Sequence, residues 1–246
     1  MKNLHRANID YLIHRPFTVF EIKNFLSEEK YLELLETFPN TKNFGNSKEG
    51  NVIDPGSAYY EDHLNKNKGW NNFISLLNNQ KFIDNAYKFA LIPSIRARGI
   101  KAIKKWTLRE KGYLLKKFFR RVTVEAHFTI QRRGEFLNLH TDAKSKLLSM
   151  IYYFADDNSN LKNAGTEFWV NKKNYLPWKN WENKHITSKD RINKFRLENE
   201  VFFKSDFEKN KLVGFIKSNN SWHSVLDHNI TAGEIRRAFV INIREK

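Results

Sequence analysis

A histidine and an aspartate stand two positions apart, directly before a strongly apolar run, in "LNLHTDAKSKLLSMIYYF" (137–154). In an extended chain the side chains at i and i+2 point to the same side, so His140 and Asp142 can face one spot. Such a pair could bind a metal ion or form a buried ion pair, and the motif also arises by chance. The chain has no cysteine, so any metal must be held by histidine and carboxylate ligands.

A second histidine, His223 in "SWHSVL", also lies at the edge of an expected strand. Two imidazoles and one carboxylate on one face of a metal form the facial triad of non-haem Fe(II) oxygenases, which leaves coordination positions open for other ligands. The remaining histidines are interpreted as surface or locally bonded side chains: His5, His14, His63, His127, His185 and His228.

An arginine opens the last apolar run, "RRAFVINI", thirteen residues after His223. By the period of two in a strand, Arg236 shares a face with Ala238, Val240 and Asn242, whereas Arg237 starts the opposite, apolar face. The small Ala238 leaves room beside the guanidinium of Arg236, which suits a bidentate grip on a carboxylate. We favour Arg236 for this contact, with Arg237 as the alternative.

Two hydroxyl side chains share one face of the expected strand "LLSMIYYF", because Ser149 and Tyr153 alternate with apolar residues. Their hydroxyls could bond to the same carboxylate. The alternative is that each hydroxyl simply lies at the rim of a sheet.

The elements that must position these residues are expected to be helices first and strands afterwards. We expect a strand over 17–26, a helix over 27–39 that is capped by Ser27 and ended by Pro39, a loop over 40–72 and helices over roughly 70–90 and 96–121. After residue 121, short β-branched and aromatic runs alternate with turn residues, and a polar insert covers 171–211. The layout predicts one domain over 1–246, with a helical support (1–121) and an antiparallel sandwich or barrel (122–246).

The net charge of +16 suggests an anionic partner such as a nucleic acid, a phosphorylated sugar or a lipid headgroup surface. A lysine-rich surface that only interacts with water explains it equally well. The chain has no apolar run of signal-peptide or membrane-spanning length, so we expect a soluble, cytoplasmic protein.

Taken in order, these segments resemble the Fe(II)/2-oxoglutarate-dependent dioxygenase superfamily, most closely its prolyl-hydroxylase-like branch. The similar segments are "FTVFEIKNFLSEEKYLELLETFP", "GEFLNLHTD", "LLSMIYYFAD", "GTEFW", "SWHSV" and "RRAFVINI". The resemblance implies a double-stranded β-helix, or jelly-roll, core. It also implies that His140, Asp142 and His223 bind Fe(II), and that Arg236 pairs with the distal carboxylate of 2-oxoglutarate, with Tyr153 and Ser149 assisting.

Two positions depart from that family's pattern. Gln131 stands where a tyrosine is usual, so we assign Gln131 to the 2-oxoglutarate pocket, and Ala238 stands where a serine or threonine is frequent. The carboxylate of Asp142, which halogenating members lack, favours hydroxylation of an unactivated C–H bond, or a demethylation that begins with it. O2 is then a cosubstrate, 2-oxoglutarate is converted to succinate and CO2, and ascorbate is expected to stimulate the reaction.

The substrate is expected to be a polar small molecule or a peptidyl residue, with an anionic sugar or nucleotide favoured by the charge. Segments 40–72 and 171–200 are candidate lids, and the candidate walls are Tyr59, Tyr60, Trp169, Trp178 and Trp181. The rival hypothesis is a non-catalytic basic barrel that uses 96–121 to bind nucleic acid or an anionic surface. The sequence does not predict an oligomeric state.

Overall fold

The structure is a computed structural model that describes residues 1–2, 4, 8–45, 51–98, 122–133, 135, 137–143, 145–156, 160–173, 186, 188–218, 220–225, 230 and 233–245.

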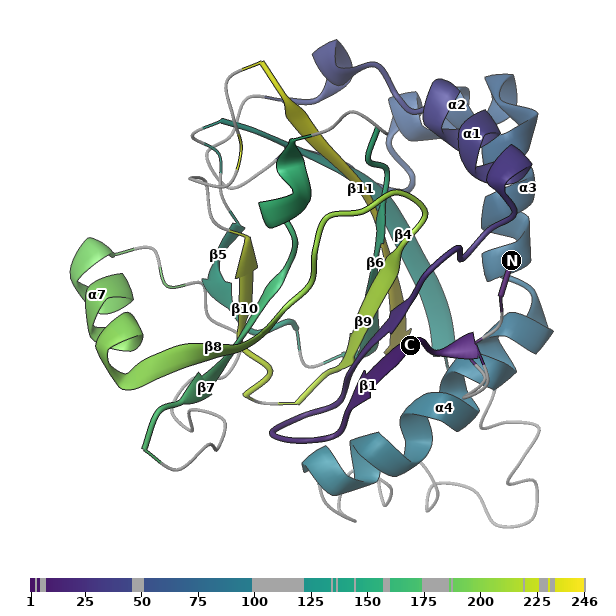
Figure 1. Cartoon of the computed structure of the whole chain (residues 1–246). Helices are drawn as coiled ribbons and strands as arrows, with labels where there is room; N and C mark the ends of the chain where they lie inside the picture. The colour runs from purple at the N-terminus through teal and green to yellow at the C-terminus, as the bar shows by residue number, and fades with distance from the viewer. Residues whose placement is uncertain are drawn as a thin grey trace, which may run out of the picture.

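A large antiparallel sheet runs through the middle of the molecule, with its strands in the order β1-β2-β9-β6-β11-β4-β3 (Figure 1). These strands are β1 (Tyr11–Ile13), β2 (Val19–Ile22), β3 (Asn51–Ile53), β4 (Val122–Arg132), β6 (Lys146–Tyr153), β9 (Leu212–Ile216) and β11 (Ile235–Glu245). The two longest, β4 and β11, pair in unbroken register from Ile235 opposite Arg132 to Glu245 opposite Val122. Because β11 carries Arg236, its long pairing with β4 fixes the position of that residue in the sheet.

A smaller antiparallel sheet faces the large one and has the order β5-β10-β7-β8. Its strands are β5 (Leu137–His140), β7 (Glu167–Asn171), β8 (Asn199–Lys204) and β10 (His223–Val225). Apolar side chains from both sheets fill the space between them, and the ring of Phe168 on β7 packs edge-on against Phe215 on β9 at 5.4 Å. The two sheets therefore form the jelly-roll core expected from the sequence.

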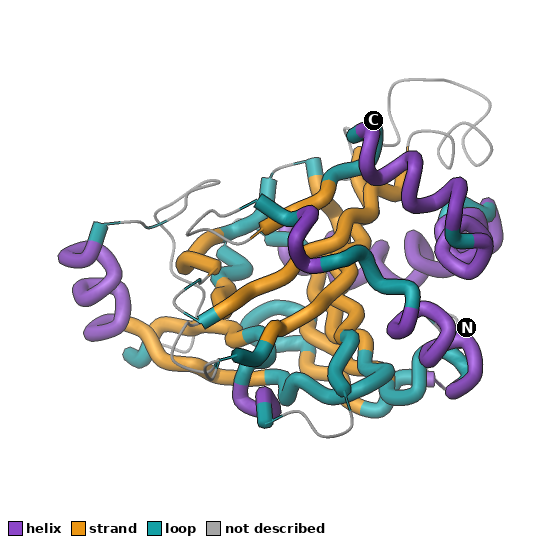
Figure 2. Tube along the Cα trace, turned by 90° about the horizontal axis from the view of Figure 1, so that it is seen from above, coloured by secondary structure: helices purple, strands orange, loops and turns teal. Residues whose placement is uncertain are grey.

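Helices cover the other face of the large sheet, as the views in Figures 1 and 2 show. They are α1 (Glu28–Glu36), α2 (Ala58–Lys66), α3 (Lys68–Leu77) and α4 (Gln80–Arg98). The fully buried Trp70 of α3 packs its ring 4.6 Å from Phe128 and 5.1 Å from Phe239 of the sheet. Replacing such a tryptophan by alanine costs about 3–5 kcal/mol, so this cluster is a main attachment of the helical layer. The prediction of a mainly β protein with flanking helices is confirmed.

The expected loop over 40–72 is wrong. It contains a 3₁₀ helix (Thr41–Asn43), β3, α2 and the start of α3. Helix α2 buries Tyr60, His63 and Leu64 and exposes the polar residues between them, so its short apolar stripe is hidden in a polar composition. The assignment of His63 to a polar surface loop is wrong for the same reason.

The polar insert over 171–211 also contains regular structure, namely α7 (Lys189–Glu198) and β8. The strand expected over 17–26 is limited to β2, and α1 ends at Glu36, before Pro39. A further 3₁₀ helix covers Leu161–Asn163. Of the basic segment 96–121, the structure describes only the end of α4 up to Arg98, so the rest of that expected helix lies outside the described residues.

Within the described part of the chain, no helix combines the length and the apolar character needed to cross a bilayer.

Candidate active site

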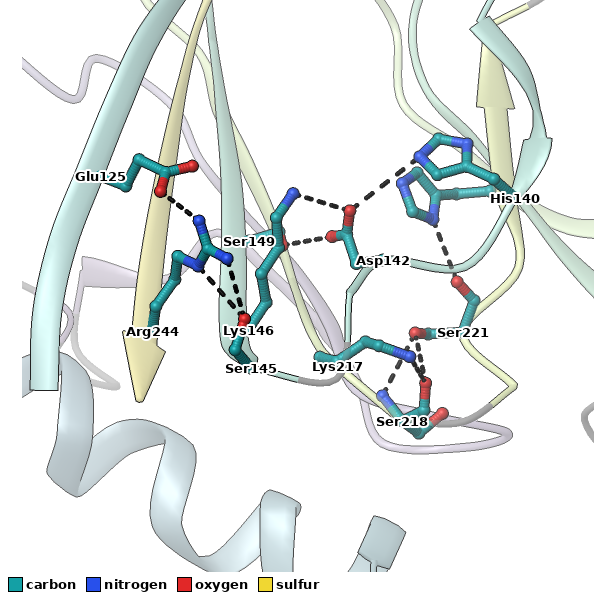
Figure 3. Close-up of polar contacts among 11 residues, drawn as sticks. Glu125, His140, Asp142, Ser145, Lys146, Ser149, Lys217, Ser218, Ser221 and Arg244 are labelled. Atoms are coloured by element: carbon teal, nitrogen blue, oxygen red, sulfur yellow. Dashed lines mark hydrogen bonds and ion pairs between the residues drawn. The ribbon is translucent and has the colours of Figure 1, made fainter. Parts of the chain in front are cut away.

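The smaller sheet places two histidines side by side. His140 is the last residue of β5 and His223 is the first of β10, and the two are opposite one another in the antiparallel pair, with ring centroids 4.1 Å apart. Asp142 follows β5, and its Oδ1 lies 3.9 Å from Nε2 of His140. Figure 3 shows the Asp142 carboxylate pointing toward the ring of His140. One ligand atom of each of the three buried residues lies within 4.8 Å of the others, so the structure brings together the predicted triad.

The backbone orients the ring of His223 for metal binding. Its Nδ1 lies 3.0 Å from the carbonyl oxygen of Ser221, which can only accept a hydrogen bond. Nδ1 therefore carries the proton, and Nε2 keeps the lone pair that a metal requires. Burial lowers the pKa of His223, and the neighbouring Asp142 only partly offsets this effect, which favours the neutral imidazole that coordinates metals.

Two side chains of β6 hold the carboxylate of Asp142. Lys146 Nζ donates to Oδ1 at 2.8 Å, and the Ser149 hydroxyl donates to Oδ2. Burial alone would raise the pKa of Asp142, but the Lys146 ammonium and the two imidazoles outweigh it, so this pKa lies far below its usual range. Asp142 is thus a fixed anion. Ser149, which the sequence assigned to 2-oxoglutarate, bonds to the triad in this structure.

A cavity of roughly 320 Å³ between the two sheets contains the triad at its wall and Arg236 at another point of the same wall. Arg236 is only 3% exposed. Its Nε donates to the carbonyl of Ala164 at 2.7 Å and its Nη1 to Oε1 of Gln131 at 3.0 Å, and its guanidinium lies over the rings of Tyr153 and Phe207. No acidic side chain among the described residues pairs with Arg236. A buried cation with only neutral partners is costly, and a bound carboxylate would neutralise it.

Arg237 points away from this cavity. Its guanidinium lies 3.3 Å from both carboxylate oxygens of the exposed Asp156. The alternation along β11 therefore places Arg236 in the cavity and Arg237 on the opposite side, in an ordinary ion pair.

The other residues assigned to the 2-oxoglutarate pocket surround Arg236. Gln131 lies opposite it in the β4–β11 register, and among the described residues its Nε2 has no hydrogen-bond partner. The Tyr153 hydroxyl donates to Oγ1 of Thr166 at 2.9 Å and accepts from the Thr166 backbone N–H at 3.0 Å. Thr166 lines the cavity, whereas the described lining does not include Tyr153. The hydroxyl of Thr166 is therefore the one presented to a ligand.

The aromatic walls expected from the sequence lie elsewhere. Tyr59 and Tyr60 belong to α2, and Tyr60 donates to the Ala126 carbonyl at 2.9 Å in the core on the helical side of the large sheet. Trp169 is buried with Phe195 and Trp222 in a separate cluster outside the described lining of the cavity. Tyr60 and Trp169 therefore fill cores and do not belong to the described lining of the cavity. Trp178 and Trp181 lie outside the described residues.

Sequence reasoning missed six polar residues that line the cavity: His127, Thr129, Thr141, Lys146, Thr166 and Asn242. His127 was set aside as a surface or locally bonded histidine, and that interpretation is wrong. Alternation along the last strand did place Asn242 on the face of Arg236, which was a usable signal. The position of Lys146, four residues after Asp142, gave no such signal, because a turn and not a helix joins the two residues.

No family model matches the sequence, and no curated protein matches it closely. Several solved structures match. One of prolyl 4-hydroxylases from Phytophthora capsici is 9% identical and has a TM-score of 0.52, over 92% of this chain and 58% of that one. A prolyl-4-hydroxylase from Pseudomonas putida is 13% identical, over 93% of this chain and 92% of that one, with a TM-score of 0.45.

A prolyl hydroxylase from Trichoplax adhaerens, in complex with a hypoxia inducible factor peptide fragment, is 12% identical over 92% of this chain and 83% of that one, with a TM-score of 0.43. The Phytophthora capsici match shows that this chain has the fold of prolyl 4-hydroxylases, so the resemblance seen in the sequence is confirmed at the level of the fold. Identities this low establish a fold and not a reaction.

Proposed function

We propose that this protein is an Fe(II)/2-oxoglutarate-dependent oxygenase that hydroxylates an unactivated C–H bond of a polar substrate. One observation carries the proposal. A buried His-Asp-His cluster and a buried arginine without an acidic partner among the described residues line the same cavity. The first suits a metal with open coordination positions, and the second suits the far carboxylate of a dicarboxylic acid.

The residues present fit both groups. His140, Asp142 and His223 would hold the metal, since each offers a ligand atom to one point and two of them are already oriented by hydrogen bonds. Arg236 would hold the distal carboxylate of 2-oxoglutarate, and the unpartnered Nε2 of Gln131 would supply a second donor beside it. Gln131 thereby replaces the usual tyrosine with a different donor.

When bound, Fe(II) with 2-oxoglutarate and O2 supplies the oxidising power to break a C–H bond while 2-oxoglutarate becomes succinate and CO2. The chain itself binds and orients these groups and excludes water from them. Lys146 and Ser149 keep the Asp142 carboxylate in place, and the Ser221 carbonyl holds the tautomer of His223. Apolar walls that include Ile151, Phe215 and Val240 keep the reacting region dry.

The test is succinate formation from 2-oxoglutarate by purified protein given Fe(II) and then O2. His140→Ala should abolish it, and His14→Ala, which changes an exposed histidine, should not. If turnover requires the missing substrate, equilibrium binding of a metal and of 2-oxoglutarate is the second readout. The proposal would be refuted if His140→Ala kept both metal binding and turnover at the level of the wild type.

A further inference from the structure

One amide in the cavity, that of Asn242, has no partner for either of its polar atoms among the described residues. Asn242 of β11 is fully buried and lines the cavity, and among the described residues neither its Oδ1 nor its Nδ2 has a hydrogen-bond partner. Leaving a buried polar group unpaired is unfavourable, and Asn242 leaves two such atoms. Groups of this kind in native proteins need an explanation, and a ligand is one.

The strand register places Asn242 beside the triad. Asn242 is opposite Ser149 of β6 on one side and Glu125 of β4 on the other, and Ser149 bonds to Asp142. Arg236 is six residues away along the same strand, which is roughly 20 Å between α-carbons at 3.3 Å per residue. Asn242 therefore lies beside the Ser149–Asp142 contact of the triad. A carboxylate bound to Arg236 leaves the amide of Asn242 free.

His127 is another polar residue of the cavity lining that has, among the described residues, an unpartnered atom. It lies opposite Val240, on the strand next to Asn242 and one inward-facing row away, and its Nδ1 has no partner in the described part of the chain. Burial, helped by the Lys146 ammonium, lowers the pKa of His127 to about 4. The imidazole is therefore neutral at pH 7 and can either donate or accept.

The charges around these two residues are already neutralised. Figure 3 shows Lys146 on Asp142, and Arg244 between Glu125 and Ser145. Among the described residues of the lining, the amide of Asn242 and Nδ1 of His127 remain unpartnered, as do Oγ1 of Thr141 and Nε2 of Gln131. The amide of Asn242 offers a donor and an acceptor side by side. Such a surface complements a neutral group that also has a donor next to an acceptor, and it offers no free cation to an anion.

We infer that Asn242, assisted by His127, holds a carboxamide-type group of the substrate beside the triad and selects it over a carboxylate. The inference rests on the proposed function, because the triad defines where the substrate reacts. It replaces the anionic substrate expected from the net charge with an uncharged polar one. Asn242 is thus assigned as a specificity-determining residue.

The experiment measures binding of three fragments of similar shape to Zn(II)-loaded protein with 2-oxoglutarate, by saturation-transfer NMR. The fragments are benzamide, benzoate and acetophenone. We expect wild-type protein to bind benzamide at least ~10-fold more tightly than benzoate, corresponding to about 1.4 kcal/mol. Asn242→Leu should reduce benzamide binding to the level of acetophenone. Thr129→Val, which alters another polar residue of the cavity lining, should keep the preference.

Stability gives an independent readout. Because leucine has the same branched shape as asparagine but no polar atoms, Asn242→Leu should raise the melting temperature of the ligand-free protein by roughly 2–10 °C. Absence of benzamide binding, or a preference that survives in Asn242→Leu, overturns the inference. Failure of the wild type to bind Zn(II) and 2-oxoglutarate, measured first, refutes instead the proposed function.

Discussion

Arg236 allows a test in which ligand affinity and protein stability should respond very differently. We consider Arg236→Met, which keeps an unbranched side chain of similar length but removes the charge. Burying an isolated ion costs several kcal/mol. In the ligand-free protein this cost is offset by hydrogen bonds to Ala164 and Gln131, at about 1.5–3 kcal/mol each, and by the two rings, at about 0.5–2 kcal/mol.

These opposing contributions nearly cancel. The free energy of unfolding of ligand-free Arg236→Met should therefore stay within about 2 kcal/mol of the wild type. Affinity for 2-oxoglutarate should change far more, because the substitution leaves a buried carboxylate without its cation. Removing one partner of such a pair costs about 2–5 kcal/mol, which is a loss of roughly 30-fold to several thousand-fold in Kd.

Arg237→Met is the matched control. It removes the same group from the next residue, but there the guanidinium is paired with the exposed Asp156 on the other side of the strand. An exposed pair of this kind contributes at most about 1 kcal/mol. The assays are calorimetric titration of 2-oxoglutarate into anaerobic Mn(II)-loaded protein and chemical unfolding without ligand. A Kd that changes less than ~3-fold in Arg236→Met, or equally in both variants, would show that the reasoning is wrong.

Three further perturbations test other parts of the account. A β-carbon on Gly165 would lie 1.5 Å from a backbone oxygen, so Gly165→Ala should lower the free energy of unfolding by about 1–3 kcal/mol. A β-carbon on Gly45 would meet nothing nearer than 4.0 Å, so the control Gly45→Ala should change this free energy by under about 0.5 kcal/mol. Urea unfolding of both variants measures the difference. The pKa of about 4 for His127 lies below its ordinary value of 6.5, so the unfolded chain takes up a proton that the folded chain does not. The free energy of unfolding should therefore fall as pH falls from 6.5 toward 4, by about 2 kcal/mol between pH 7 and pH 5. His127→Gln should lose this part of the pH dependence. Equal pH profiles of unfolding for the metal-free wild type and the variant would contradict this role of His127. Lys146→Met removes the ammonium that holds Oδ1 of Asp142 at 2.8 Å, so it should weaken Mn(II) binding by about 10-fold or more in calorimetry; tighter binding would contradict the role of Lys146 in holding this carboxylate.

His140, Asp142 and Arg236 could be proposed from the sequence because they follow local rules, whereas His223 was added through the order of the motifs and the family resemblance. His140 and Asp142 lie two apart next to a strand, and Arg236 opens a strand whose alternation fixes its face. Both rules depend only on neighbours along the chain, so they survive without knowledge of the fold. The short apolar runs predicted an antiparallel sandwich or barrel, and the resemblance to the dioxygenase superfamily specified a jelly roll.

The functional neighbours of the triad depend on strand register, which no local pattern reveals. Asn242 matters because it falls opposite Ser149 and its amide has no hydrogen-bond partner among the described residues, and His127 matters because it lies one row away. The prediction that aromatic side chains line the substrate cavity was wrong, because the sequence does not distinguish an aromatic ring in a core from one in a pocket. Tyr60 and Trp169 each went to a core.

The most direct test of the central claim is the visible absorption of the protein under anaerobic conditions with Fe(II) and 2-oxoglutarate. A 2-oxoacid that chelates Fe(II) through its keto and carboxylate oxygens produces a charge-transfer band that neither component produces alone. We predict that the band forms at one equivalent of Fe(II) per chain, weakens strongly in Arg236→Met and is absent in His140→Ala. Absence of the band in wild-type protein at saturating Fe(II) and 2-oxoglutarate, or its persistence in His140→Ala, would contradict the assignment of this cavity.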